Sequence, residues 1–472
     1  MTDGVPSPGD TAGQVPLATI AREWGRIGII GFGGPPAHIV LLRRLCVDDR
    51  HWLSAREFED GIAATNLMPG PASTQLAIFC AWRLRGAIGA VLGGACFILP
   101  GLVIILALAV AFLAGHPPLW VQGAAAGAGA AVPAVAVHAA ASLLPASFRQ
   151  TRGRRAGRAR WLAYLAAGAA AGATAGPLLV AVLLACGLVE AGISVRSAPG
   201  SPARPGLGWI PLLAGLARRG SLPAGPLAAG RVPGSPASAG SALAGSALSG
   251  SPLASSGRAG PSLAGAGLAA GGLGALAWVA VKVGALSFGG GFVIIPLMQH
   301  DAVVTYHWMT GAQFLNAVAL GQVTPGPVVL TVGVVGYAAA GIGGGLLAVL
   351  IAFLPSFVLV IAGGPHLGRL RSSERVQSFL SGAGPAAIGA IAGAAIPLAR
   401  ELGHLWQAGV LLLAACWLLA PSRLPSPVRL PSLSRLPSLS RLPALNRGVV
   451  TALLCSAGIG VLAVLAGAPV SR

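Results

Sequence analysis

Two copies of a Pro-Gly-Pro motif hold the residues of this chain with the clearest chemical potential. They are Pro69-Gly70-Pro71 and Pro325-Gly326-Pro327. A proline removes a backbone donor and clashes with the preceding turn, so neither motif can lie inside a continuous helix. A helix that restarts after such a motif begins with free N–H groups, which attract anions. The sequence therefore predicts two broken helices whose ends form a cradle for an anion.

Polar side chains beside both motifs are predicted to complete this cradle. Asn66 and Gln322 each precede the first proline of a motif by three residues. Thr74 and Gln75 follow the first motif, and Thr324 directly precedes the second. Hydroxyl and amide groups donate the hydrogen bonds that the oxygens of a dianion accept. The competing interpretation is that the prolines only kink helices for packing, and the duplication argues against it.

A second duplicated motif is a phenylalanine followed by two glycines. It occurs as Phe32-Gly33-Gly34 and Phe288-Gly289-Gly290, and in each case a basic residue, Arg26 or Lys282, stands six positions earlier. Glycines allow the backbone to approach a ligand closely, although small residues also serve helix packing. We expect both motifs to bind the substrate and both basic residues to attract it. The alternative for the basic residues is a snorkelling anchor at the membrane interface.

Titratable and catalytic groups are scarce. Glu190 lies in the apolar segment 176–195 and is the candidate for proton coupling, with a plain interfacial position as the alternative. His38 and His138 could also titrate, or could be hydrogen-bonded packing residues. The chain contains no Walker motif, metal-ligand cluster or nucleophile elbow. We therefore expect no enzymatic activity, no metal and no cofactor.

The two motifs belong to one long internal repeat. Phe32 and Phe288 are 256 residues apart, as are Pro69 and Pro325. In an apolar chain, a repeat with glycine and proline breaks at matching positions is typical of secondary transporters. The breaks of the two halves then meet around one binding site.

The composition predicts a membrane protein. Of the 472 residues, 55% are hydrophobic and 9% are charged, against about 25% charged residues in soluble domains. Uncharged runs at 86–114, 119–144, 342–363 and 449–466 are near or above the length of a spanning helix. We expect an all-α, polytopic integral membrane protein of the inner (cytoplasmic) membrane. Its partners are the lipid bilayer and a small inorganic oxyanion, and a homodimer is left open.

The net charge of +19 comes from arginines between the apolar segments, as the positive-inside rule expects, and does not indicate a nucleic-acid partner. The chain divides into an N-terminal tail (1–20), a first repeat (21–195), a linker rich in Gly, Ala, Ser and Pro (196–261) and a second repeat (262–468). A basic Arg-Leu-Pro loop at 423–447 is predicted to be disordered.

The arginines also predict how the halves are oriented. In the first half they flank both broken segments, whereas Val283 to Gly368 contains no Lys or Arg. Hairpins that enter from the cytoplasm in one half and from outside in the other would explain this difference. We therefore expect inverted-topology repeats with broken or re-entrant helices. Inversion needs an odd number of crossings before the second half, and Ser262–Val281 could supply the odd one.

At these motifs the sequence resembles the chromate ion transporter family in its long two-domain form, over about residues 20–195 and 273–465. The segments that carry the resemblance are Ile30–Pro35, Trp52-Leu53, Asn66–Gln75, Leu286–Gly291 and Ala319–Pro327. The resemblance implies a secondary transporter that exports chromate, driven by the proton-motive force, and so confers chromate resistance. Some members carry an acid directly after the first Pro-Gly-Pro motif, where this chain has Ala72.

Three alternatives remain open. Chromate and sulfate share shape and charge, so a carrier for sulfate or another oxyanion, working in either direction, would need the same donors. A membrane-embedded enzyme acting on lipid would need clustered acids, histidines or serines at helix ends, which the duplicated breaks lack. An anion channel differs from a carrier in having a flux that neither saturates nor depends on a proton gradient.

Overall fold

The computed structural model describes residues 15–66, 68–113, 117–149, 151, 155–174, 176–196, 270–287, 291–364, 373–420 and 448–469. These residues fold into helices, and no strand occurs among them. The N-terminal tail up to residue 14, the linker predicted at 196–261 beyond its first residue, and the loop predicted at 423–447 lie outside the described residues.

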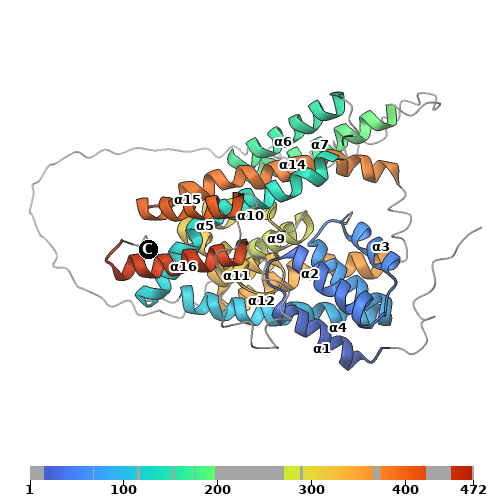
Figure 1. Cartoon of the computed structure of the whole chain (residues 1–472), viewed down its shortest axis with the longest axis horizontal. Coiled ribbons are helices and arrows are strands. Elements are labelled where there is room, and N and C mark those ends of the chain that lie inside the picture. The colour runs from blue at the N-terminus through green and yellow to red at the C-terminus, as the bar shows by residue number, and fades with distance from the viewer. Residues whose placement is uncertain are drawn as a thin grey trace, which may run out of the picture. The chain divides into compact units, whose positions relative to one another are not determined.

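The first repeat runs from the N-terminal end of the described chain through its seventh α-helix (Figure 1). Its elements are α1 (Leu17–Ile30), α2 (Pro35–Arg43), the π-helical turn η1 (Arg44–Asp49), α3 (Ala55–Thr65), α4 (Ala72–Leu113), α5 (Leu119–Arg149), α6 (Arg155–Thr174) and α7 (Gly176–Arg196).

The second repeat follows the same order of elements. They are α9 (Ala270–Leu286), α10 (Ile294–Gln299), η2 (His300–Thr305), α11 (Gly311–Val323), the short η3 (Val328–Leu330), α12 (Thr331–Gly363), α14 (Glu374–Arg400), α15 (Leu405–Leu419) and α16 (Val449–Leu465). Among the described helices, four are long and apolar enough to cross a membrane: α4, α5, α12 together with η3, and α14.

The two repeats match in local detail. The turns η1 and η2 begin and end 256 residues apart, and His51 and His307 behind them share a φ of 52°. Ser54 starts α3 with a capping box, and Thr310 starts α11 in the same way. A capping box satisfies two of the free donors at a helix start. Equivalent sequence signals therefore end and restart the helices at equivalent places.

Both long helices bend sharply after the breaks. The bend lies at Arg85 and Gly86 in α4 and at Ala340 and Gly341 in α12. Gly86 and Gly341 have φ values of 58° and 63°, and a methyl group built on either would meet nothing within 4 Å. The glycines are therefore required by backbone conformation, which other residues rarely adopt, rather than by crowding.

The run Ser262–Val281, which could supply the odd crossing, is described from Ala270 onward. Ala270 to Val281 belong to α9, which continues to Leu286. Helix α9 leads straight into the second Phe-Gly-Gly motif and is the counterpart of α1. Residues 262 to 269 lie outside the described chain.

Equivalent helices of the two repeats pack against each other in opposite directions. Gly94 of α4 faces Phe357 of α12, whereas Leu106, later in α4, faces Gly345, earlier in α12. Helices α5 and α14 are also antiparallel. Residues 140 and 144 of α5 lie beside residues 388–392 of α14, whereas the earlier residues 133–137 of α5 lie beside the later residues 395–399 of α14. The long helices of the two repeats therefore run antiparallel.

The last two helices of each repeat pack on the other repeat. Helices α6 and α7 lie along α14, and α15 and α16 lie along α5 (Figure 1). Small residues allow close approach: a methyl group on Gly168 or Gly172 of α6 would collide with the backbone of Ala386 or Ala390 in α14. In each repeat, one long helix is therefore covered by the last two helices of the other repeat.

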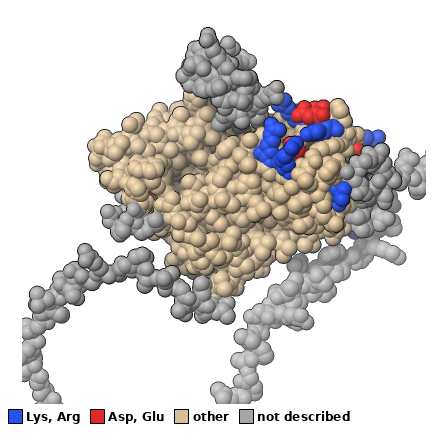
Figure 2. Space-filling view, turned by 90° about the horizontal axis from the view of Figure 1, so that it is seen from below, with Lys and Arg blue, Asp and Glu red and all other residues tan. Residues whose placement is uncertain are grey.

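Charged side chains gather at one end of the face drawn in Figure 2, and the rest of that face is uncharged. In the first repeat, the pair Arg43–Glu59 joins α2 to α3, Arg44–Asp49 lies within η1, and Arg83–Glu57 joins α4 to α3. The counterpart region of the second repeat holds the pair Lys282–Asp301. The two sets of broken helices thus differ strongly in charge.

Candidate anion-binding site

The helix interruptions predicted from the sequence occur in both repeats. Helix α3 ends at Thr65 and α4 begins at Ala72, while α11 ends at Val323 and α12 begins at Thr331 after the single turn η3. Gly70 and Gly326 at the centres of the Pro-Gly-Pro motifs have φ values of 124° and 104°. Both positions need glycine, because this region is strained for other residues.

The first Phe-Gly-Gly turn touches the second Pro-Gly-Pro break directly. The N–H of Gly326 donates a hydrogen bond to the carbonyl oxygen of Gly31, at 3.0 Å. His38 Nε2 lies 2.9 Å from the same oxygen. A carbonyl oxygen only accepts, so Nε2 carries the proton in this contact. Motifs almost 300 residues apart in the chain are therefore joined through one oxygen atom.

The two Phe-Gly-Gly motifs also converge on Val328, directly after the second break. A methyl group built on Gly34 would lie 3.8 Å from Val328 Cγ2, and one on Gly291 would lie 3.4 Å from Val328 Cβ. Phe288, Gly289 and Gly290 themselves lie outside the described residues. The described parts of both turns therefore lie beside the second break.

The first break is lined by polar side chains from the start of α4. Thr74 and Gln75 have no exposed surface. Gln75 Nε2 donates a hydrogen bond to the carbonyl oxygen of Pro69, at 2.6 Å. Helix α12 of the other repeat contributes Ser356, which is also fully buried and lies next to Gly70.

At the second break, the threonine hydroxyls bond to backbone carbonyl oxygens of the same segment. The Thr324 hydroxyl donates to Leu320 O at 2.7 Å, and the Thr331 hydroxyl donates to Val328 O at 2.7 Å. Gln322 is 7% exposed and faces the protein interior. Its counterpart in position, Asn66, is exposed. The two amides predicted to act as a pair therefore occupy different environments.

Buried polar atoms without a hydrogen-bond partner concentrate in this region of the described structure. They are Thr74 Oγ1, Gln75 Oε1, Ser287 Oγ, Gln322 Nε2, Ser356 Oγ and His38 Nδ1. Each of these residues lies in a motif, beside one, or bonded to one. Leaving such a group unsatisfied costs about 1–3 kcal/mol, and native proteins rarely do so without a reason. An arrangement of this kind suits a polar ligand that completes the bonds.

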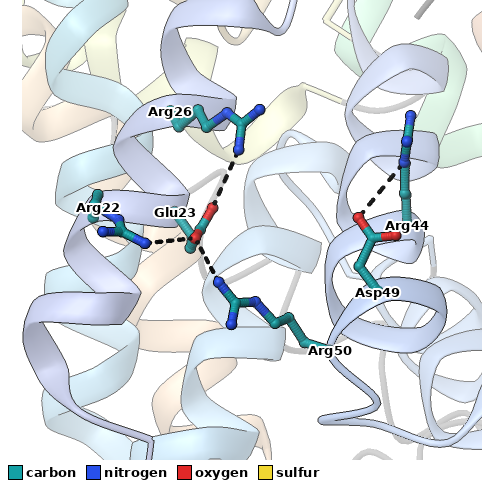
Figure 3. Close-up of polar contacts among 6 residues, drawn as sticks. All are labelled: Arg22, Glu23, Arg26, Arg44, Asp49 and Arg50. Atoms are coloured by element: carbon teal, nitrogen blue, oxygen red, sulfur yellow. Dashed lines mark hydrogen bonds and ion pairs between the residues drawn. The ribbon is translucent and has the colours of Figure 1, made fainter. Parts of the chain in front are cut away.

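The two basic candidates are already engaged with carboxylates. Arg26, whose side chain is 69% exposed, shares Glu23 with Arg22 and Arg50 (Figure 3). Glu23 itself is nearly buried, at 8% side-chain exposure. The three arginines around one carboxylate keep a net positive charge at the entrance to the first turn. Arg50 also lies over the Trp52 ring, 5.7 Å from its centre.

Lys282 is placed differently from Arg26. Its ammonium lies 2.5 Å from Asp301 Oδ2, and the two side chains are 18% and 8% exposed. The ammonium also lies 5.8 Å from the centre of the Trp278 ring. The pair ties α9 to the π-helical turn η2. Two residues that match in sequence thus have unlike surroundings.

Glu190 lies in α7, away from both breaks. Arg160 of α6 donates to its two oxygens at 2.9 and 3.0 Å, and the Tyr164 hydroxyl donates to it at 3.0 Å. The carboxylate is therefore held by a bidentate pair and a third donor, the strong arrangement for an arginine and a carboxylate. His138 was weighed as a second titratable group, and its ring lies near Gly448 at the start of α16.

Two hollows on the described surface lie away from the breaks and are mostly apolar. One, of about 370 Å³, is lined by residues of α5, α6 and α14 such as Leu165 and Ile388. The other, of about 530 Å³, is lined by residues of α5, α14 and α15 such as Val137 and Leu411. They are counterparts in the two repeats. Apart from Arg400 in the second hollow, the residues that line them are apolar, so the breaks remain the better candidate site.

Sequence reasoning missed Ser356 as a site residue. The signal was present, because Pro100-Gly101 and Pro355-Ser356 form another matched pair, 255 residues apart. The shift from 256 to 255 follows a one-residue difference between the repeats after the breaks. His38 was recognised as titratable, but its contact with Gly31 could not be inferred without knowing the fold.

Taken together, four helices capable of spanning a membrane and duplicated broken helices define a multi-pass membrane protein. The chain belongs to the chromate transporter family, because the family described as "Chromate transporter" matches residues 18–191 and 274–434. The family resemblance at the Phe-Gly-Gly and Pro-Gly-Pro motifs is thereby confirmed.

Curated relatives agree with this assignment. A "Chromate transport protein" of Cupriavidus metallidurans is 30% identical over 83% of this chain and 84% of its own length. A "Probable chromate transport protein" of Synechococcus elongatus is 28% identical over 85% of this chain and 90% of its own length. A "Chromate transport protein" of Pseudomonas aeruginosa is 28% identical over 79% of both chains. No solved structure matches the chain.

Proposed function

We propose that this protein exports chromate across the inner (cytoplasmic) membrane, driven by the proton-motive force, and so confers chromate resistance. The observation that carries the proposal is the set of unpartnered buried donors at the breaks and turns, namely the hydroxyls of Thr74, Ser287 and Ser356 and the amide nitrogen of Gln322, in a chain whose family transports chromate. A tetrahedral dianion accepts hydrogen bonds at every oxygen, so it can satisfy hydroxyl and amide donors that the protein leaves free.

The substrate-binding residues of the proposal come from both repeats. The first repeat contributes Arg26, Phe32, Gly33, Gly34, Asn66, Pro69, Gly70, Pro71, Thr74 and Gln75, and the second contributes Lys282, Phe288, Gly289, Gly290, Gln322, Thr324, Pro325, Gly326 and Pro327. The bond from Gly326 N–H to Gly31 O supports a shared site, because it joins a break of one repeat to a turn of the other.

Transport is tested with inside-out vesicles, in which export appears as uptake. We expect chromate accumulation that saturates and that a protonophore abolishes. The variant Gly70→Ala would place a methyl group 2.5 Å from Gln75 Nε2 at a φ of 124°, so we expect it to lose uptake. Gly409→Ala is the control, because Gly409 lies within helix α15 and a methyl group there meets nothing within 4 Å. Absence of uptake by the wild type, or saturable uptake only of sulfate, would overturn the chromate proposal.

We further propose that the repeats have inverted topology in the membrane. The antiparallel packing of α4 with α12 and of α5 with α14 supports this arrangement. So does the concentration of arginines around the broken helices of one repeat only.

Topology is tested with a matched pair of exposed positions, Asp48 in η1 and Val304 in η2. Each is replaced by cysteine in a chain without its native cysteines. In intact cells, a membrane-impermeant maleimide is expected to label V304C and spare D48C. Labelling of both positions from the same side would contradict the inversion.

Glu190 is the proton-coupling residue of this proposal. Glu190→Gln keeps the size and hydrogen-bonding capacity of the side chain but cannot release a proton, so we expect uptake that no longer responds to a protonophore. The control is Arg160→Gln, which breaks the same pair while keeping the carboxylate. If Glu190→Gln remains fully protonophore-sensitive and only melts at lower temperature, Glu190 is part of a structural ion pair instead.

A further inference from the structure

The central glycine of each Pro-Gly-Pro motif lies between the start of its own long helix and the long helix of the other repeat. A methyl group built on Gly70 would lie 2.5 Å from Gln75 Nε2 and 2.9 Å from Ser356 Oγ. Gln75 belongs to α4 and Ser356 to α12. Two polar side chains from different repeats thus flank the first break.

The second break has the same geometry with different chemistry. A methyl group built on Gly326 would lie 3.3 Å from Leu330 Cδ1 and 3.9 Å from Gly101 Cα. Leu330 lies beside Gly326 as Gln75 lies beside Gly70, and Gly101 lies there as Ser356 lies at the first break. An isobutyl group therefore takes the place of the amide, and the hydroxyl is missing.

The two breaks also differ in what remains unpartnered. At the first break, the hydroxyls of Ser356 and Thr74 are fully buried donors that make no hydrogen bond with the described chain, and the acceptor Gln75 Oε1 is also without a partner. At the second break, the N–H of the central glycine is already bonded to Gly31 O, and the unpartnered buried donor is the amide nitrogen of Gln322, four residues before that glycine. Two unpartnered buried hydroxyls are therefore found at the first break.

We propose that Ser356 and Gln75 form a neutral oxyanion-selecting cradle beside Gly70, and that the second break, where Leu330 and Gly101 lie beside the central glycine, has no matching cradle. The inference rests on the proposed function and adds the place where the dianion is recognised.

The cradle is suited to oxygen geometry rather than to charge. Ser356 offers its hydroxyl, and Gln75 offers the second hydrogen of the amide nitrogen whose first hydrogen binds Pro69 O. The first backbone N–H groups of α4, from Ala72 onward, have no acceptor within their own helix. Neither the stretch 66–75 nor α12 contains Asp or Glu that would repel an anion. Donors fixed on two sides fit a tetrahedral dianion better than a planar monoanion.

The test measures the Kd of chromate, sulfate and nitrate for the purified full chain by isothermal titration. For Ser356→Ala we expect chromate and sulfate to bind about tenfold more weakly, with little change for nitrate. Gln75→Leu, which reproduces the apolar chemistry of Leu330, is expected to have at least as large an effect. Ser456→Ala is the matched control, because Ser456 is also buried but lies in α16 against α5. Its affinities should stay within about twofold of the wild type.

Melting temperature separates binding from folding. Ser356→Ala removes only an unpartnered buried hydroxyl, so its melting temperature without ligand should equal or exceed that of the wild type. Wild-type affinity for all anions in Ser356→Ala and Gln75→Leu would overturn the cradle while leaving chromate transport standing. An equal loss for nitrate would overturn its selectivity. No binding of chromate or sulfate to the wild type would overturn the cradle together with the proposed function.

Discussion

Single residues at matching sequence positions have acquired different roles in the two repeats. Arg26 is mostly exposed and lies among several arginines around Glu23, whereas Lys282 is nearly buried and bonded to Asp301. Two interpretations of Lys282 follow, an anion-attracting group and a structural ion pair. They differ in what happens when the charge and its partner are removed together.

We expect Lys282→Met alone to destabilise the protein, because it leaves the carboxylate of Asp301 buried without a partner. Breaking a buried pair from one side costs about 3–5 kcal/mol, whereas replacing both members with apolar residues is often neutral. The double variant Lys282→Met with Asp301→Leu should therefore regain the wild-type melting temperature. Its chromate uptake separates the interpretations: recovery indicates a structural pair, and a stable but inactive protein indicates contact between Lys282 and the anion.

The capping residue Glu57 makes stability depend on pH. Partial burial opposes its ionisation, but hydrogen bonds from the Ser54 backbone and from Arg83 outweigh burial and hold the pKa of Glu57 below its usual value. A lowered folded-state pKa contributes stability that is present above the unfolded pKa and is lost as the pH falls through the folded pKa.

We therefore expect the melting temperature of the wild type to fall on acidification below about pH 4.3 more steeply than that of Glu57→Gln. Melting curves between pH 3 and 7 test this, with the exposed Glu59→Gln as control. Parallel curves for wild type and Glu57→Gln would show that Glu57 contributes nothing to the acid sensitivity.

At the scale of elements, the packing of α6 on α14 depends on glycines at the contact. A methyl group on Gly389 would collide with the carbonyl oxygen of Leu165, whereas one on Gly384, in the same helix, would meet open space. We expect Gly389→Ala to destabilise the protein by about 1–3 kcal/mol through overpacking. Gly384→Ala should be neutral or stabilising by up to about 1 kcal/mol, because alanine favours helix.

Thermal melting of the two alanine variants in detergent measures this difference directly. The substitution, the helix and the backbone conformation are shared, so only the neighbour differs. A melting temperature for Gly389→Ala equal to that for Gly384→Ala would mean that α6 and α14 are not in close contact.

The elements themselves were largely predictable, and their assembly was not. Proline chemistry predicted where α3 and α11 end, because it acts within one turn of a helix. The capping pairs Ser54–Glu57 and Thr310–Gln313 follow a local sequence pattern too, although the sequence analysis did not use it. By contrast, the contact of Gly70 with Ser356 joins residues that no local rule connects. Lys282 was predicted to face the anion because Asp301, nineteen residues away, could not be recognised as its partner.

At the scale of the whole molecule, each repeat depends on the other for its last helical layer. Helix α5 is covered by α15 and α16, and α14 is covered by α6 and α7. The two halves expressed as separate chains, divided between residues 197 and 264, are therefore expected to accumulate only when they are produced together. Co-purification through a tag on one half measures this. Stable accumulation of either half alone would contradict the dependence of each repeat on the other.

Because the last helices of each repeat cover the other repeat, the fold has a consequence for how the two-repeat chain arose. A primitive chain with one repeat would have had to recruit a sister copy, packed with its long helices antiparallel to the first, before its own hydrophobic surface was covered. Fusion of two such genes would then have preserved an existing pair of subunits. After fusion, the two copies could diverge, so that Gln75 and Ser356 came to lie beside one central glycine and Leu330 and Gly101 beside the other.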